Sequence, residues 1–176
     1  EAMIEREPIT VVCSKMGWIR AMKGHIALDT ALKFKDGDEG RFVFHAETTD
    51  RLLILGRNGR FYTLSATTLP GGRGMGEPLR LMVDLPNEVE ILTMRIYRPG
   101  ERLLLASSAG DGFIVPSDEV LAQTRGGKQV LTVRGDTVAQ VCRVVRGNHV
   151  AAVGENRKVI IFPIEELPEM NKGKGV

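Results

Sequence analysis

Short apolar runs separated by glycine turns set the pattern of this chain, and residues 51–76 show it most completely. An apolar run leads into a turn at Arg57-Asn58-Gly59, and a second apolar run follows. A corner at Leu69-Pro70 then precedes a basic, glycine-rich turn. Short apolar and β-branched runs bounded by such turns are typical of β-strands. The stretch therefore predicts a β-hairpin followed by a cationic loop.

The same order of features recurs along the chain. Residues 102–128 and 148–175 repeat the apolar runs, the turn, the corner and the basic glycine turn, and residues 9–25 hold a shorter copy. Repeats of this length made of short strands are typical of propeller blades. Several runs are apolar throughout, as expected for strands covered on both faces. The central turns recur every 42 to 51 residues, at Gly17, Gly59, Gly110 and Arg157.

We expect residues 1–176 to form one all-β, propeller-like domain with about four recognisable blades, open or truncated. The repeats cover roughly 9–33, 40–86, 88–135 and 137–176. Both ends fall in partial repeats, so we expect a fragment of a longer protein, with its ring closed by the two ends or missing a blade. Helical periodicity is weak and predicts only a single turn at residues 116–122. The strands predicted in the three fuller repeats are residues 42–46, 52–55, 60–64 and 79–83, then 90–96, 103–106, 112–115 and 129–133, then 138–145, 150–153 and 159–164.

Composition indicates a folded, soluble chain. Of the 176 residues, 43% are apolar and 26% charged, which excludes a disordered polyelectrolyte. No run approaches the length of a membrane span, and no segment resembles a signal peptide. Cys13 and Cys142 lie in apolar runs and are expected to be buried free thiols, which suits the cytoplasm. The net charge is only +2, so a role with nucleic acid must depend on where the charges lie.

No catalytic constellation is visible in the sequence. His25, His45 and His149 lie far apart without metal-ligand spacing, and C-x-x-C and Walker A motifs are absent. Residues 71–76 are glycine-rich but lack the strand-to-helix context of a nucleotide loop. Tyr62 and Tyr97 are expected to pack rather than to react. We therefore expect no catalytic residue, metal or cofactor in this domain, which by itself is not an enzyme.

Positive charge recurs on the glycine turns, once in each repeat. Glycine lets backbone N–H groups approach a phosphate closely, while Arg or Lys neutralises its charge. In a radial repeat such positions lie around one perimeter, which predicts a curved basic track for DNA. The alternative is a set of ordinary solvated turns, and the repetition favours the track. The turn candidates are Lys23, Arg73, Arg125, Lys128, Lys172 and Lys174, and a second set flanks the central turns at Lys15, Arg20, Arg57, Arg60, Arg157 and Lys158.

These motifs resemble a known family. Residues 9–25, 68–79 and 170–175 are similar to the C-terminal DNA-wrapping domain of bacterial type IIA topoisomerase A subunits, a β-pinwheel whose blades exchange a strand. The gyrase members carry a Q-R-R-G-G-K-G box in the first blade. Here residues 123–129 read Q-T-R-G-G-K-Q and lie in the third repeat. This departure favours the topoisomerase IV branch over gyrase.

The resemblance implies sequence-independent binding and bending of duplex DNA around the basic perimeter. The disc would present DNA to a strand-passage core elsewhere in the A subunit, in decatenation and chromosome segregation in the cytoplasm. It also implies that the catalytic tyrosine, the Mg²⁺ site and the ATP-binding B subunit lie outside these residues. The alternative is a protein-interaction β-propeller with no nucleic-acid role. A propeller hydrolase would require converging carboxylates or histidines, which the sequence does not place.

Overall fold

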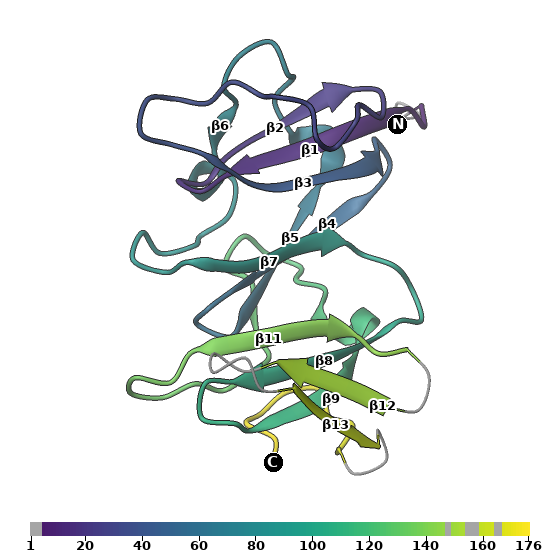
Figure 1. Cartoon of the computed structure of the whole chain (residues 1–176), viewed down its shortest axis with the longest axis vertical. Helices are drawn as coiled ribbons and strands as arrows, with labels where there is room; N and C mark the ends of the chain where they lie inside the picture. The colour runs from purple at the N-terminus through teal and green to yellow at the C-terminus, as the bar shows by residue number, and fades with distance from the viewer. Residues whose placement is uncertain (1–4, 147–148, 154–158, 164–166) are drawn as a thin grey trace.

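The computed structural model describes residues 5–146, 149–153, 159–163 and 167–176, and within these ranges the chain is built from β-strands and three short 3-10 turns. The sheets follow one another along the long axis of the molecule, with the N-terminus at one end and the C-terminus at the other (Figure 1). Among the described residues, no helix is long and apolar enough to cross a membrane. The prediction of an all-β fold is confirmed.

The first sheet has the strand order β3-β1-β2-β6. Its centre is the hairpin of β1 (Pro8–Ser14) and β2 (Trp18–Lys23). The hairpin turns at Gly17, whose φ of 88° only glycine adopts readily. Both outer strands come from further along the chain, β3 (Gly40–Glu47) beside β1 and the short β6 (Glu77–Pro78) beside β2.

The second sheet repeats this plan in the order β10-β5-β4-β7. Its hairpin is β4 (Arg51–Gly56) and β5 (Arg60–Ser65), and its outer strands are β7 (Ile91–Ile96) and β10 (Lys128–Gln129). In the third sheet the hairpin of β8 (Arg102–Ser107) and β9 (Gly112–Pro116) pairs with β11 (Ala139–Val144). The strands β12 (His149–Val153) and β13 (Val159–Pro163) form a further antiparallel pair.

Each of the first three sheets is therefore completed by the next sequence repeat. The first strand of a repeat joins the sheet before it, since β3 pairs with β1, β7 with β4 and β11 with β8. The basic glycine segment joins the preceding sheet on its other side, as β6 does with β2 and β10 with β5. The third sheet receives the segment after Pro168, where a parallel bridge joins Glu169 to Ile114 of β9 and the backbones of Gly112 and Val176 exchange two hydrogen bonds. We call this arrangement the strand exchange; it is the pinwheel feature that the resemblance implied.

One predicted strand is wrong, and another was predicted too long. Residues 79–83 were predicted as a strand, but Leu79–Leu81 is the 3-10 turn η2. Leu79 and Val83 are both buried, at a four-residue spacing that suits a helical turn better than a strand. In the segment 129–133 only Gln129 extends β10, because the N–H groups of Val130 and Leu131 both turn to the carbonyl of Gly59.

Elsewhere the predicted strands and the single turn are found. The turn predicted at residues 116–122 is the 3-10 turn η3 (Ser117–Val120). Arg157, Lys158 and residue 164 lie outside the described residues.

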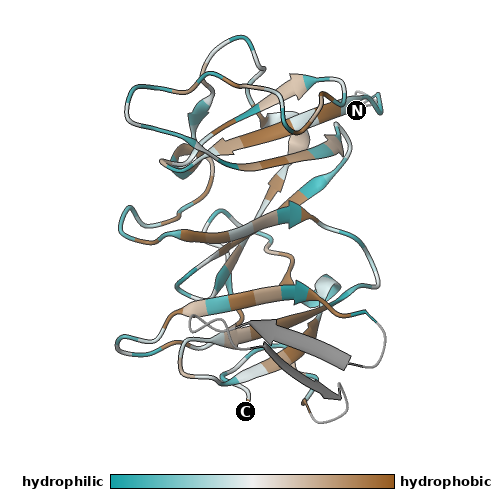
Figure 2. Ribbon diagram, in the orientation of Figure 1, coloured by the Kyte–Doolittle hydropathy of each residue, from teal (hydrophilic) through white to brown (hydrophobic). Residues whose placement is uncertain are grey.

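The sheets enclose two principal cores, and alternate side chains of β4 enter different ones. Leu52 and Ile54 pack in the core between the first and second sheets, while Leu53 and Leu55 pack in the core between the second and third. This explains why the apolar run shows no polar alternation. Figure 2 shows apolar residues concentrated on the strands and hydrophilic residues on the connecting loops.

The cysteines are free, as predicted, with Cys13 buried and Cys142 partly buried. Burial raises the pKa of the Cys13 thiol to about 12, so it remains protonated and unreactive.

Candidate nucleic-acid interface

The three basic glycine turns are structurally equivalent. Each holds a glycine with positive φ, 88° at Gly76, 75° at Gly127 and 80° at Gly175. A Cβ atom there would lie 2.3 Å, 2.5 Å and 2.1 Å from one backbone carbonyl oxygen of the adjoining strand. These oxygens belong to residues two positions after the hairpin glycines, namely Ile19, Phe61 and Gly112. Only glycine permits this close approach. The three turns therefore contact equivalent positions on their hairpins.

Cations occupy these turns, but only one position is shared. Arg73 stands three residues before Gly76 and Lys172 three residues before the equivalent Gly175, and both cations are exposed. Thr124 takes that place in the middle turn, where Arg125 follows it instead. Of the cations that the sequence placed on these turns, only Arg73 and Lys172 therefore occupy equivalent positions.

The other predicted turn cations are bonded to neighbouring groups. Arg125 lies 3.5 Å from Asp84 and donates to the carbonyl of Leu81 at 2.8 Å. The Lys128 ammonium donates to the Glu119 carbonyl at 2.6 Å. Lys174 pairs with Asp111 at 3.3 Å and keeps 69% of its side chain exposed. These groups stay near the surface, but a phosphate would have to compete with their present partners.

Lys23 does not belong with these turns. It is the last residue of β2, and the N–H of the following Gly24 donates to the carbonyl of Pro8. The sequence grouped Lys23 with the basic glycine turns because both contain a Lys-Gly or Arg-Gly pair. In the structure it ends a hairpin strand and does not return to a neighbouring sheet, although its side chain is exposed.

Two arginines of the second predicted set donate to carbonyls of the glycine turns, Arg20 from a buried side chain and Arg60 from a half-buried one. Arg20 is only 5% exposed, and its guanidinium donates to the carbonyls of Gly74 and Lys33. Arg60 donates to the carbonyl of Gly126 at 2.5 Å. To contact phosphate, as the sequence predicted, each guanidinium would have to leave these carbonyls. Their observed role is to fix the turns that carry the exposed cations.

The remaining members of that set differ from one another. Arg57 donates to the Ala139 carbonyl at 3.2 Å and pairs with Glu90 at 3.1 Å, so it links the second and third sheets. Lys15 is exposed at the first hairpin turn and lies 3.5 Å from Glu39. Arg57 therefore has a structural role, while Lys15 remains accessible.

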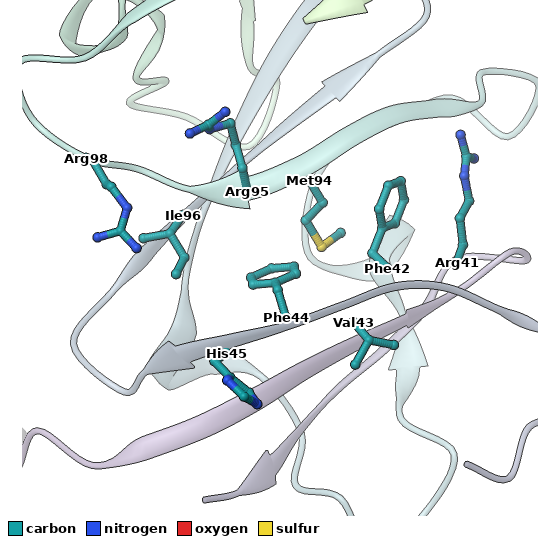
Figure 3. Close-up of a pocket in the computed structure, with 9 residues that line it drawn as sticks. All are labelled: Arg41, Phe42, Val43, Phe44, His45, Met94, Arg95, Ile96 and Arg98. Carbon is teal, nitrogen blue, oxygen red and sulfur yellow. The ribbon is translucent and has the colours of Figure 1, made fainter. Parts of the chain in front are cut away.

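The structure also shows a basic groove that sequence reasoning missed. It has a volume of about 420 Å³ and lies between β3 and β7, with Phe44, Met94 and Ile96 pointing into it (Figure 3). Arg41 and Arg98 stand at its two ends. No acidic side chain is among the residues that line it. Its complete lining is Arg41, Phe42, Val43, Phe44, His45, Met94, Arg95, Ile96 and Arg98.

Two histidines that the sequence analysis placed far apart are stacked. The rings of His25 and His45 lie 4.5 Å apart with an interplanar angle of 13°. The Nε2 of His25 lies 2.9 Å from the Ala46 carbonyl, and the Nε2 of His45 lies 2.6 Å from the Ile26 carbonyl. Because a carbonyl only accepts, each Nε2 donates a hydrogen bond. The pair fastens the loop after β2 onto β3. Within the described ranges, no three His, Cys, Asp or Glu side chains group as metal ligands would.

Both tyrosines have packing roles. Tyr62 is 1% exposed, and its hydroxyl accepts a hydrogen bond from Asn58. Tyr97 donates to Asp118, which raises the pKa of its hydroxyl, while the Arg51 guanidinium lies 4.9 Å from its ring centre. The raised pKa keeps the Tyr97 hydroxyl protonated, which does not favour it as a nucleophile.

Comparison with known proteins gives consistent results. The family model of the DNA gyrase C-terminal domain, a β-propeller, matches residues 50–98, 101–141 and 148–176. The A subunit of DNA topoisomerase 4 from Caulobacter vibrioides is 50% identical over 100% of the chain, and that from Rickettsia conorii 47% over 99%. The chain spans about a quarter of the length of these relatives, 23% and 24% respectively.

Solved structures show the same relationship. The C-terminal domain of Escherichia coli ParC superposes with a TM-score of 0.83 and 31% identity, covering 96% of this chain and 70% of that one. A DNA gyrase A C-terminal domain gives a TM-score of 0.67 at 18% identity, covering 97% of this chain and 59% of that one, which shows a shared fold.

Proposed function

The chain belongs to the family of DNA gyrase C-terminal β-propeller domains, in the branch of the topoisomerase IV A subunits, and from this premise we propose that it binds and bends duplex DNA along its basic glycine turns. The observation that carries the proposal is the shared position of Arg73 and Lys172. Both are exposed cations on turns that equivalent glycines hold at the same height on the first and third sheets. A duplex that contacts both turns follows the outside of the molecule.

Binding of this kind is independent of DNA sequence. Cations and backbone N–H groups on turns contact phosphates, which carry no base information directly. Within the described residues there is no α-helix that could enter the major groove. The domain would present bent DNA to the strand-passage core of the parent protein, together with an ATP-binding partner, in the cytoplasm on the nucleoid. Mg²⁺ and ATP would act in those other parts and not in this domain.

The test is a salt titration of binding to linear duplexes of unrelated sequence. Each neutralised phosphate contributes about −0.9 to the slope of log K against log salt. Arg73→Gln with Lys172→Gln should flatten the slope by roughly 2, to the same degree on every duplex. A preference of about a thousandfold or more for one sequence would contradict the proposal, because that is the scale of specific recognition.

The control for this test is Lys15→Gln with Lys23→Gln. It removes the same charge from exposed side chains that do not lie on the glycine turns. If this control flattens the slope as strongly as the turn variant, binding follows total charge and the turns have no special role.

A further inference from the structure

The basic groove between β3 and β7 has apolar walls and cationic ends. Phe44 of β3 and Met94 and Ile96 of β7 point into it, and Arg41 and Arg98 stand at its two ends (Figure 3). Met94 is buried, whereas Phe44 and Ile96 are only half-buried and pack against the core between the first two sheets. The core therefore fixes these walls in place, and they present apolar surface to a ligand.

The charges of the groove are all of one sign. The residues that line it include three arginines and no aspartate or glutamate. Arg95 is bonded to Glu101 at 3.3 Å and points to the other side of β7, so it contributes little. Arg41 and Arg98 are exposed, and the Arg41 guanidinium lies 4.9 Å from the centre of the Phe42 ring. A ligand that matches this groove is therefore apolar along its middle and anionic at its ends.

The groove lies at the sheet edges that are remote from the basic glycine turns. In the order β3-β1-β2-β6, the strand β3 and the glycine segment β6 occupy opposite ends, and in the order β10-β5-β4-β7 so do β10 and β7. A duplex bound along the glycine turns therefore leaves the groove open. The apolar walls also offer nothing to a phosphate, which is bound by cations and hydrogen-bond donors.

The two strands also offer backbone groups to a ligand. Because β3 and β7 each end the strand order of their sheet, one edge of each has no neighbouring strand in the part of the chain that the structure describes. An extended peptide binds such an edge through main-chain hydrogen bonds, while its alternate side chains fill pockets. The groove volume of about 420 Å³ is large enough for such side chains. An extended chain segment therefore fits the groove.

We propose that the basic groove docks an acidic segment of another protein, which inserts apolar side chains between β3 and β7 and sets carboxylates against Arg41 and Arg98. Charge complementarity selects this occupant, because arginine offers paired donors to a carboxylate and no acidic side chain of the lining opposes it. This inference goes beyond the proposed function. DNA and the acidic segment occupy opposite edges of the sheets, so both can be bound at once.

The test presents two libraries of short peptides to the parent chain. Every peptide has a core randomised among apolar residues, serine and threonine. One library carries Asp or Glu on both sides of the core, and the other carries Lys there. The parent chain should retain peptides of the acidic library that have apolar cores, and none of the Lys library. Retention of neither library at low salt, or of both equally, would overturn the inference.

A charge swap then locates the selected peptide. Arg41→Glu with Arg98→Glu should weaken its binding by at least about tenfold, because like-charge contacts replace two ion pairs, and should bind its Lys-flanked counterpart instead. The matched control, Lys33→Glu with Arg134→Glu, makes the same change of charge at exposed loop residues. Equal weakening in this control would overturn the inference, because binding would then follow net charge. An unchanged thermal midpoint shows that both variants are folded.

Duplex DNA is the competing occupant, and a salt titration distinguishes it. Arg41→Gln with Arg98→Gln should change the slope of log K against log salt no more than Lys33→Gln with Arg134→Gln does. A further flattening by roughly 2 would assign the groove to phosphates and overturn the inference. Displacement of the selected peptide by a saturating linear duplex would do the same. Neither result affects the proposed function, which is tested on the glycine turns.

Discussion

At the residue scale, the positive-φ glycines of the basic turns combine two constraints that a side chain cannot meet together. Gly127 has φ 75°, and a Cβ atom would lie 2.5 Å from the Phe61 carbonyl oxygen. Gly24 has a similar φ of 79°, but no atom lies within 4 Å of its Cβ position. The two positions therefore separate the cost of backbone conformation from the cost of a close contact.

Gly127→Ala should destabilise the chain by at least about 2 kcal/mol, since the contact adds to the cost of about 1–2 kcal/mol for a left-handed residue. Gly24→Ala should lose only the conformational part, about 1–2 kcal/mol. Denaturant unfolding followed by circular dichroism measures both. Equal losses in the two variants would mean that the turn before β10 can move away from β5.

Arg20 and Arg73 should have opposite effects when replaced. Arg20→Met leaves two partly buried carbonyls without a donor, at a cost of about 1–3 kcal/mol each, while the salt dependence of DNA binding stays close to that of the parent. Arg73→Gln should flatten that slope by about 0.9 with a stability change near zero. A stable Arg20→Met variant with a flattened slope would show that Arg20 reaches phosphate after all.

At the element scale, the strand exchange separates neighbours in sequence from neighbours in space. Met94 belongs to the third sequence repeat, yet it pairs with Ile54 of β4 and packs in the core between the first and second sheets. Leu105, in the same repeat, packs in the other core. Stability couplings should follow the cores and not the repeats.

A double-mutant cycle tests this. Met94→Ala should cost about 2–5 kcal/mol and Ile54→Val about 0.5–1.5 kcal/mol, with a coupling of at least about 0.5 kcal/mol between them. Met94→Ala and Leu105→Ala should be additive within about 0.5 kcal/mol. Strong coupling within the second pair, and none in the first, would contradict the observed strand order.

The sequence predicts the hairpins well but not the partners of the outer strands. An apolar run reports that a strand is buried, whereas no local pattern says which sheet buries it. The repeats therefore indicated most strand positions, whereas the exchange by which β3 completes the first sheet was implied only by the family resemblance. Leu79 and Val83 were predicted as a strand because the window is too short to separate periods of two and four.

The site shows the same limit. Arg20, Arg60 and Arg73 have identical side chains near glycine turns, and only the fold separates the two that bind carbonyls from the one that is exposed. Arg98, at the end of the basic groove, did carry a signal in the sequence. The pattern Arg-x-x-Arg at residues 95–98 returns at 143–146, at the repeat distance.

At the scale of the whole molecule, the present bonds of the middle turn predict a smaller role for it than for the outer turns. Arg125→Ala with Lys128→Ala should flatten the salt slope by up to roughly 2 if both groups leave their partners for phosphate. Asp84 and the carbonyls of Leu81 and Glu119 already bind these two cations. We therefore expect this double variant to flatten the slope less than the double variant of Arg73 and Lys172 does. Parallel titrations of the two double variants give the order, and the reverse order would place the main contact on the second sheet.

The strand exchange also bears on how such a chain can grow. The second and third repeats each donate an outer strand and a glycine segment to the preceding sheet, and each accepts the same two pieces from the repeat that follows. If the gene segment for one repeat were duplicated, the new repeat would fit between its neighbours. Its donated strand, its glycine segment and the hairpin that accepts those of the next repeat are all encoded in the same unit. Duplication of a repeat can therefore change the number of blades without requiring a new interface between them.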